Sequence, residues 1–123
     1  MTSGQVTREL TERPAVELLG LLRARKISPL ELAEEHIRRI ERLNPALNAL
    51  VDFDAQRVRD QVREAERSTA PRGPLFGLPV TVKASISTAG HRCEAGSLIN
   101  RGNVASQDAT VVARLRQAGA TIL

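Results

Sequence analysis

PLFGLPVTVKASISTAG, residues 74–90, is the stretch around which the rest of this chain can be interpreted. Its glycine and proline predict a loop that ends at Gly77, and the apolar, β-branched run that follows predicts a strand from Leu78. Because side chains alternate along a strand, Lys83 and Ser85 should face the same side. The stretch therefore predicts a polar surface on an otherwise apolar strand.

Lys83 is one of only two lysines among the 18 basic residues of the chain. A lysine loses its proton when it is desolvated, whereas arginine stays protonated, so Lys83 is a candidate general base. The competing interpretation is a lysine at a strand edge with its ammonium group in water. A catalytic pair of Lys83 and Ser85 alone is a third interpretation, but same-side neighbours lie about 6.5–7 Å apart along a strand and would need a bend to meet.

Composition limits the classes of protein that this chain can belong to. With 123 residues and 41% hydrophobic content, it suits one globular domain whose core is aliphatic, because two phenylalanines are its only aromatic residues. The net charge is +4, but 14 acidic residues are interspersed among the basic ones. No block of five like charges is present, and no aromatic residues are interleaved with the basic ones for base stacking, so no nucleic-acid partner is expected.

Cysteine and histidine give no sign of a metal site, a cofactor or a disulfide. Cys93 is the single cysteine and has no neighbour that identifies a base for it, so an unremarkable thiol in a reducing compartment is expected. His36 lacks a nearby second ligand for a metal. The N-terminus has no apolar signal-peptide core and no run approaches the roughly 18 apolar residues that span a membrane. We therefore expect a cytoplasmic protein with no membrane partner, metal or cofactor.

Capping residues and prolines predict the helices of the first half. Pro14 suits the start of a helix, and Ser28 with Glu31 forms a capping box. The pair Asn44-Pro45 should stop the second helix. We then expect a short strand at 48–53 and a third helix capped by Asp54. The expected organisation is a flexible arm at 1–13, helices within 14–68, a loop at 69–77 and a strand–helix–strand unit at 78–123.

The second half has the pattern of an incomplete parallel unit. Ser106 or Asp108 should cap a helix over 108–118, Gly119 should end it, and residues 120–123 should begin a buried strand. A strand, a helix and a second strand are the parts of a parallel βαβ unit. The edge at 120–123 would be unpaired, so we expect marginal stability and a tendency to aggregate.

Four segments in order resemble the N-terminal part of the amidase signature family. The resemblance covers roughly residues 14–123 and only the first quarter of a typical member. The segments are AVELLGLLRARKISPLELAEEHIRRIERLNPALNAL at 15–50, GPLFGLPVTVKASISTAG at 73–90, AGSLINRG at 95–102 and DATVVARLRQAGATIL at 108–123. The resemblance implies an α/β fold in which N-terminal helices precede the first strands of a mixed sheet, incomplete in this chain.

The family resemblance also implies a chemistry. It implies hydrolysis of carboxylic amides, other than peptide bonds, by a Ser–cisSer–Lys triad, with Lys83 as the base that activates a nucleophilic serine through a bridging serine. The family's Gly/Ser-rich nucleophile stretch is absent from these 123 residues, so the chain alone is expected to be inactive. Members often carry Asp-Asn where this chain has Ala84-Ser85, and Asp where it has Ser87, so polar support for the lysine should be weaker.

Other functions remain open on the sequence alone. The chain could be a non-catalytic helical interaction module, one half of a split enzyme, or a fragment of the A subunit of a tRNA-dependent amidotransferase. The expected partner of a complete enzyme is a small-molecule amide, and the N-terminal helices are a candidate surface for a homodimer. The identity of the amide cannot be predicted, because the family's acyl pocket is built mostly by later residues.

Overall fold

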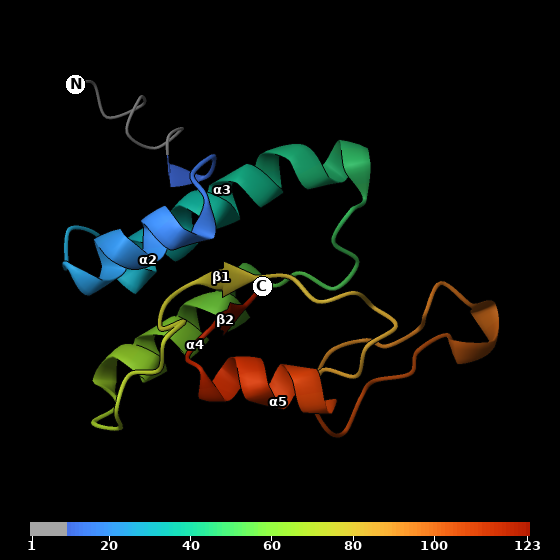
Figure 1. Ribbon diagram of the computed structural model, residues 1–123. Helices are drawn as coiled ribbons and strands as arrows, with labels where there is room; N and C mark the ends of the chain where they lie inside the picture. Colours follow the sequence, from blue (N-terminus) through green and yellow to red (C-terminus); the bar gives the residue numbers. More distant parts are fainter. Residues whose placement is uncertain (1–9) are drawn as a thin grey trace.

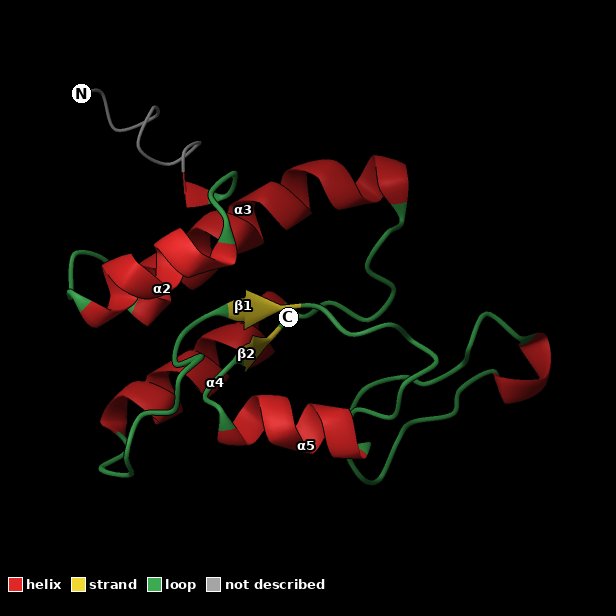
Figure 2. Ribbon diagram, viewed as in Figure 1, coloured by secondary structure: helices red, strands yellow, loops and turns green. Residues whose placement is uncertain are grey.

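The computed structural model describes residues 10–123, with helices on both sides of a small parallel sheet (Figures 1 and 2). Residues 1–9 of the expected arm lie outside the described residues, whereas Leu10 is buried against α2 and α3. The elements are α2 (Ala15–Arg23), α3 (Pro29–Leu47), α4 (Ala55–Arg67), β1 (Pro79–Val80), η1 (Leu98–Asn100), α5 (Thr110–Gln117) and β2 (Thr121–Ile122).

The capping box at the start of α3 is confirmed, but the predicted end of this helix is wrong. Ser28 Oγ accepts a hydrogen bond from the Glu31 N–H at 3.0 Å, and Glu31 Oε2 accepts one from the Ser28 N–H at 2.7 Å. The helix runs through Pro45 to Leu47. It ends instead at Asn48, whose φ of 48° is left-handed, a conformation that asparagine adopts more readily than most residues.

The strand expected at 48–53 does not form, because side chains occupy the backbone groups that a partner strand would need. Asn44 Oδ1 accepts a hydrogen bond from the Leu50 N–H at 2.9 Å, and Asn44 Nδ2 donates one to the Leu50 carbonyl at 2.8 Å. The segment is an irregular connection to α4. The cap predicted for α4 is confirmed, since Asp54 Oδ1 accepts a hydrogen bond from the Arg57 N–H at 3.0 Å.

Two apolar clusters hold the helices together. One joins α2, α3 and the start of the strand region, and the other joins α3 to α4. The fully buried Ile37 on α3 and Val58 on α4 lie in the second cluster. Because α3 contributes to both clusters, it is the central helix of the fold. The buried members are Leu10, Leu18, Leu22, Leu32 and Leu78 in the first cluster and Ala33, Ile37, Val58 and Val62 in the second.

The predicted strand–helix–strand unit is present, with shorter strands than expected. β1 and β2 are parallel, with Pro79 opposite Thr121 and Val80 opposite Ile122, and α5 lies between them in sequence. In Figure 1, α5 lies on the opposite side of the strands from α2 and α3. Regular pairing covers only these two residue pairs; in this register Leu123, the last of the 123 residues, is the only residue left beside the segment after Val80. Beyond Val80 the exposure still alternates as expected, since Thr81, Lys83 and Ser85 are exposed while Val82 and Ala84 are half-buried.

The edge predicted to be unpaired at 120–123 is covered at its centre. Gln61 on α4 donates from Nε2 to the Ile122 carbonyl at 2.9 Å and accepts at Oε1 from the Ile122 N–H at 3.0 Å. The flanking N–H groups of Thr121 and Leu123 point the other way, to the carbonyls of Leu78 and Val80. A side-chain amide thus pairs with β2 as a neighbouring strand would.

Membrane insertion of a helix finds no support in the described part of the chain. Among residues 10–123, no helix combines the length and the apolar character that crossing a bilayer requires.

Candidate active site

A cleft of about 410 Å³ opens where β1 and β2 end. In open α/β sheets, the crevice beyond the carboxyl ends of the strands is the usual place for a ligand. One wall is the segment after β1, which includes Lys83, and another is the irregular connection between α3 and α4. The cleft is lined by Ala49, Leu50, Val51, Asp52, Phe53, Thr81, Val82, Lys83, Ala84, Ile86, Thr88, His91, Arg92, Ile122 and Leu123.

Lys83 lines this cleft, but its surroundings differ from those expected. It lies three residues beyond the end of β1 and begins a tight turn in which the Ile86 N–H donates to the Lys83 carbonyl at 2.9 Å. Lys83 and Ser85 are both exposed. The desolvation predicted from an apolar strand is therefore absent among the described residues, and the assignment of Lys83 as a base stays a prediction.

The segment after Lys83 is fastened to the start of α5. Asp108 Oδ1 accepts a hydrogen bond from the Ala89 N–H at 2.8 Å, and Asp108 Oδ2 accepts one from Arg116 Nε at 2.9 Å. The hydrogen bond from Ala89 and the charge of Arg116 hold the pKa of the Asp108 carboxyl below its usual value. Neither Ser106 nor Asp108 caps α5 as predicted. The N-cap is Ala109, which has no side-chain cap.

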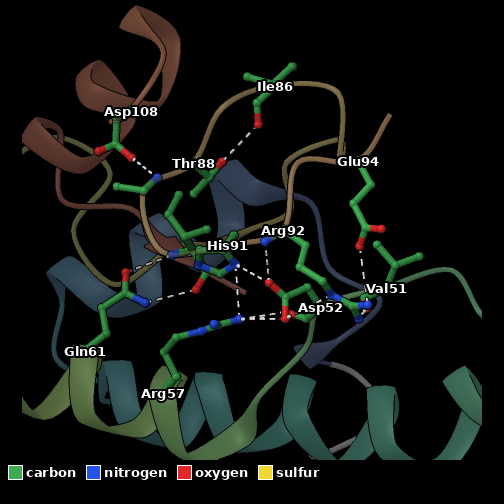
Figure 3. A network of polar contacts seen from close by, with 12 residues as sticks. Val51, Asp52, Arg57, Gln61, Ile86, Thr88, His91, Arg92, Glu94 and Asp108 are labelled. Carbon is green, nitrogen blue, oxygen red and sulfur yellow. Dashed lines mark hydrogen bonds and ion pairs between the residues drawn. The ribbon is translucent and has the colours of Figure 1, made fainter. Parts of the chain in front are cut away.

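The later part of the same segment, at His91 and Arg92, is hydrogen-bonded to Asp52 in the connection before α4 and to Arg57 on α4 (Figure 3). Asp52 Oδ2 accepts a hydrogen bond from the Arg92 N–H at 2.7 Å. Arg57 donates from Nη2 to the Asp52 carbonyl at 2.6 Å and to His91 Nδ1 at 3.1 Å. The Arg92 side chain turns back to the Val51 carbonyl and to Glu94. The chain between Lys83 and Glu94 is thus held at two points.

The surroundings of His91 in this network favour its neutral form. Burial is the main cause that lowers the pKa of His91, and the positive charge of Arg57 lowers it further. Because a guanidinium group only donates hydrogen bonds, His91 Nδ1 must accept and the ring proton must lie on Nε2. Sequence reasoning missed this cluster, since Asp52, Arg57 and His91 come from two segments that no local pattern connects.

Two further sequence-based expectations can be compared with the structure. The Cys93 Sγ lies 4.0 Å from Ser87 Oγ, a weak contact that gives the thiol no base. Within residues 10–123, no three His, Cys, Asp or Glu side chains come together as a metal site would require.

A parallel strand–helix–strand unit with helices on both sides and a cleft at its carboxyl ends is the arrangement of an α/β fold. The family model described as Amidase matches residues 31–123, well over half of the chain. The chain belongs to the amidase signature family.

Individual relatives agree with this assignment. The glutamyl-tRNA(Gln) amidotransferase of Acidothermus cellulolyticus has an A subunit that is 36% identical over 118 residues, which are 94% of this chain and 23% of the relative. The acylamidase of Rhodococcus erythropolis is 35% identical over 112 residues, 89% of this chain and 24% of the relative. The solved peptide amidase of Stenotrophomonas maltophilia superimposes with a TM-score of 0.79 at 30% identity, covering 91% of this chain and 24% of that one. The chain spans about a quarter of the length of these relatives.

Proposed function

We propose that these 123 residues are the amino-terminal portion of an amidase that hydrolyses non-peptide carboxylic amides, with Lys83 as its general base. The observation that carries the proposal is the place of Lys83, which lines the cleft at the carboxyl end of β1 in a chain of the amidase signature family. A serine hydroxyl attacks an amide only when a base accepts its proton, and a lysine accepts a proton only when it is neutral.

The proposed mechanism requires groups from outside these residues. Lys83 is exposed here, so the groups that would shield it from water have to cover it from the open side of the cleft. The bridging serine and the nucleophilic serine of a Ser–cisSer–Lys triad would also have to come from outside these residues, because no Gly/Ser-rich stretch is present in the 123 residues. We therefore propose that the chain alone does not hydrolyse amides.

A chimera tests this proposal. These residues would replace the matching amino-terminal quarter of the Rhodococcus erythropolis acylamidase, and hydrolysis of an acylamide would be followed in the chimera and in the isolated chain. Lys83→Met should lower kcat by about 10²–10⁴-fold, the usual contribution of a positioned acid or base. Lys83→Arg should be equally inactive, because arginine stays protonated.

Lys26→Met is the matched control, since Lys26 is the chain's other lysine and is exposed in the turn after α2. It should leave the rate unchanged. Equal activity of the Lys83 and Lys26 variants in an active chimera would overturn the role of Lys83 and favour a non-catalytic module. Hydrolysis by the isolated chain that depends on Lys83 would overturn the claim that groups from outside these residues are needed.

A second candidate is the A subunit of a tRNA-dependent amidotransferase, favoured by the 36% identity to the corresponding protein of Acidothermus cellulolyticus. Such an enzyme would take part in the amidation of mischarged tRNA rather than hydrolyse an acylamide. A chimera made with the Acidothermus protein, assayed with the other subunits of that enzyme for glutamine-dependent amidation of mischarged tRNA, separates the two. Activity in that setting but not in the acylamidase chimera would favour the amidotransferase.

A further inference from the structure

A second cleft, of about 310 Å³, lies at the opposite end of β1 from Lys83. It is formed by the end of α2 and by the loop that leads into β1, so it is separate from the candidate active site. Three arginines line it, Arg23 and Arg25 from α2 and the turn after it, and Arg72 from the loop. Leu19 and Leu22 supply the apolar part of its lining.

The three arginines that line this cleft are all exposed, and none of them pairs with an acidic residue among the described residues. None of the described residues that line this cleft is an aspartate or a glutamate. Among residues 10–123, no ion pair involves any of the three arginines, whereas Arg57, Arg59 and Arg116 elsewhere in the chain each pair with an acidic residue. Like charges brought together cost free energy unless a counter-charge is bound. The partial negative charge at the C-terminus of α2, about half an elementary charge, offsets only a fraction of three.

Two of the arginines contact neutral groups, and each keeps guanidinium N–H donors that these contacts do not use. Arg23 Nη2 donates to the Pro74 carbonyl at 3.0 Å. Arg72 lies over the ring of Phe76, with its guanidinium carbon 4.2 Å from the ring centroid. Because a guanidinium group has five N–H donors, both arginines keep donors for a ligand. The backbone of the loop is hydrogen-bonded to the chain after α5 as well, since the Leu75 N–H donates to the Ala118 carbonyl at 2.8 Å and the Gly77 N–H to the Gly119 carbonyl at 3.1 Å.

We propose that this cleft binds a small phosphate-chain anion, such as a pyrophosphate group. Several oxygens spread over two adjoining phosphates match planar guanidinium groups, which bind phosphate through two parallel hydrogen bonds. Single-stranded nucleic acid fits less well, because base stacking needs free aromatic rings. The chain has only two aromatic residues, and of these Phe76 is covered by Arg72 while Phe53 lines the other cleft.

Calorimetric titration of the 123-residue chain with inorganic pyrophosphate tests this inference, and it does not depend on amidase activity. Arg25→Gln and Arg72→Gln should each weaken binding about tenfold, the loss expected for a charge-assisted hydrogen bond. Arg72→Lys keeps the charge but not the paired donors, so it should also weaken binding. Circular dichroism would verify that each variant is folded.

Arg101→Gln is the matched control, because it removes one exposed positive charge far along the chain from this cleft. It should bind pyrophosphate as the unaltered chain does. Equal weakening by Arg101→Gln and Arg72→Gln would mean general attraction to a net positive chain and would overturn the proposal. Absence of pyrophosphate binding, or tighter binding of a single-stranded oligonucleotide that Arg72→Gln abolishes, would overturn it as well.

Discussion

Replacing Gln61 should remove the two hydrogen bonds that cover the edge of β2 and so lower the free energy of unfolding. In Gln61→Met the side chain keeps its length but loses the hydrogen bonds of 2.9 and 3.0 Å to Ile122. Each hydrogen bond contributes about 0.5–1.5 kcal/mol net, and a buried polar group left unpaired costs about 1–3 kcal/mol. Ile122 is 2% exposed, so water cannot readily replace the amide. We expect the free energy of unfolding to fall by about 2–3 kcal/mol.

Urea unfolding followed by circular dichroism measures this loss. With an m-value of about 1–3 kcal/mol/M, the midpoint should fall by roughly 1 M. Gln56→Met is the matched control on the same helix, because Gln56 is exposed and bonds only to the exposed Asp60. It should change stability by less than about 0.5 kcal/mol. Equal midpoints for the two variants would refute the argument that Gln61 covers the edge.

Gln61→Glu tests the Gln61 Nε2 donor separately, because glutamate keeps an acceptor oxygen but loses the N–H groups that donate to the Ile122 carbonyl. Its carboxylate can accept from the Ile122 N–H but would face the Ile122 carbonyl, so the protonated form is favoured in the folded state. A folded pKa above the unfolded value of about 4.3 means that stability is retained at low pH and lost as pH rises through the folded pKa. A destabilisation that is independent of pH would contradict this geometry.

Two further predictions concern residues at the ends of α5, namely Asp108 before it and Gly119 after it. The pKa of Asp108 is lowered in the folded chain, so its contribution is present above the unfolded value of about 3.9 and is lost as pH falls through the folded pKa. In Asp108→Asn the free energy of unfolding should therefore fall less steeply as pH drops below about 4. The same steepness in the variant and in the unaltered chain would contradict the hydrogen bond from the Ala89 N–H to Asp108. Gly119→Ala should cost more than about 1 kcal/mol, because φ is +92° and the added Cβ would lie 2.8 Å from the Phe76 Cα. Gly20→Ala, with open space around it inside α2, should instead add about 0.5–1 kcal/mol, and thermal melts that rank the two the other way would refute this reasoning.

Local signals predicted the fold where the determining contacts are local. The capping box of Ser28 and Glu31 and the cap at Asp54 each lie within four residues of the groups that they satisfy, and both are confirmed. Pro45 misled because it lies in the last turn of α3, where the helix continues only as far as Leu47 before Asn48 ends it. The parallel βαβ unit was predictable because its apolar runs flank a helix with a glycine at its end.

The site was predictable in position but not in environment. Lys83 was singled out from the rarity of lysine and the family resemblance, and it does line the cleft. Its exposure depends on what lies beside the segment after β1, and in the observed register none of the 123 residues pairs with Lys83. Asp52, Arg57, His91 and Arg92 form one network, in which the Arg92 N–H donates to Asp52, 40 positions earlier in the chain. No periodic pattern in the sequence predicts a contact between residues so far apart.

The register of the sheet has a consequence for the order of folding. Pro79 pairs with Thr121, about 42 residues later, and closing a loop of that length costs about 3.3 kcal/mol of chain entropy before any pairing is gained. The helical pair α3 and α4 is joined by a short connection and closes at lower entropic cost. During synthesis the helical layer can therefore assemble first. The wall that carries Lys83 acquires its final shape only once residues 121–122 have left the ribosome, which makes the candidate active site one of the last parts of this segment to form.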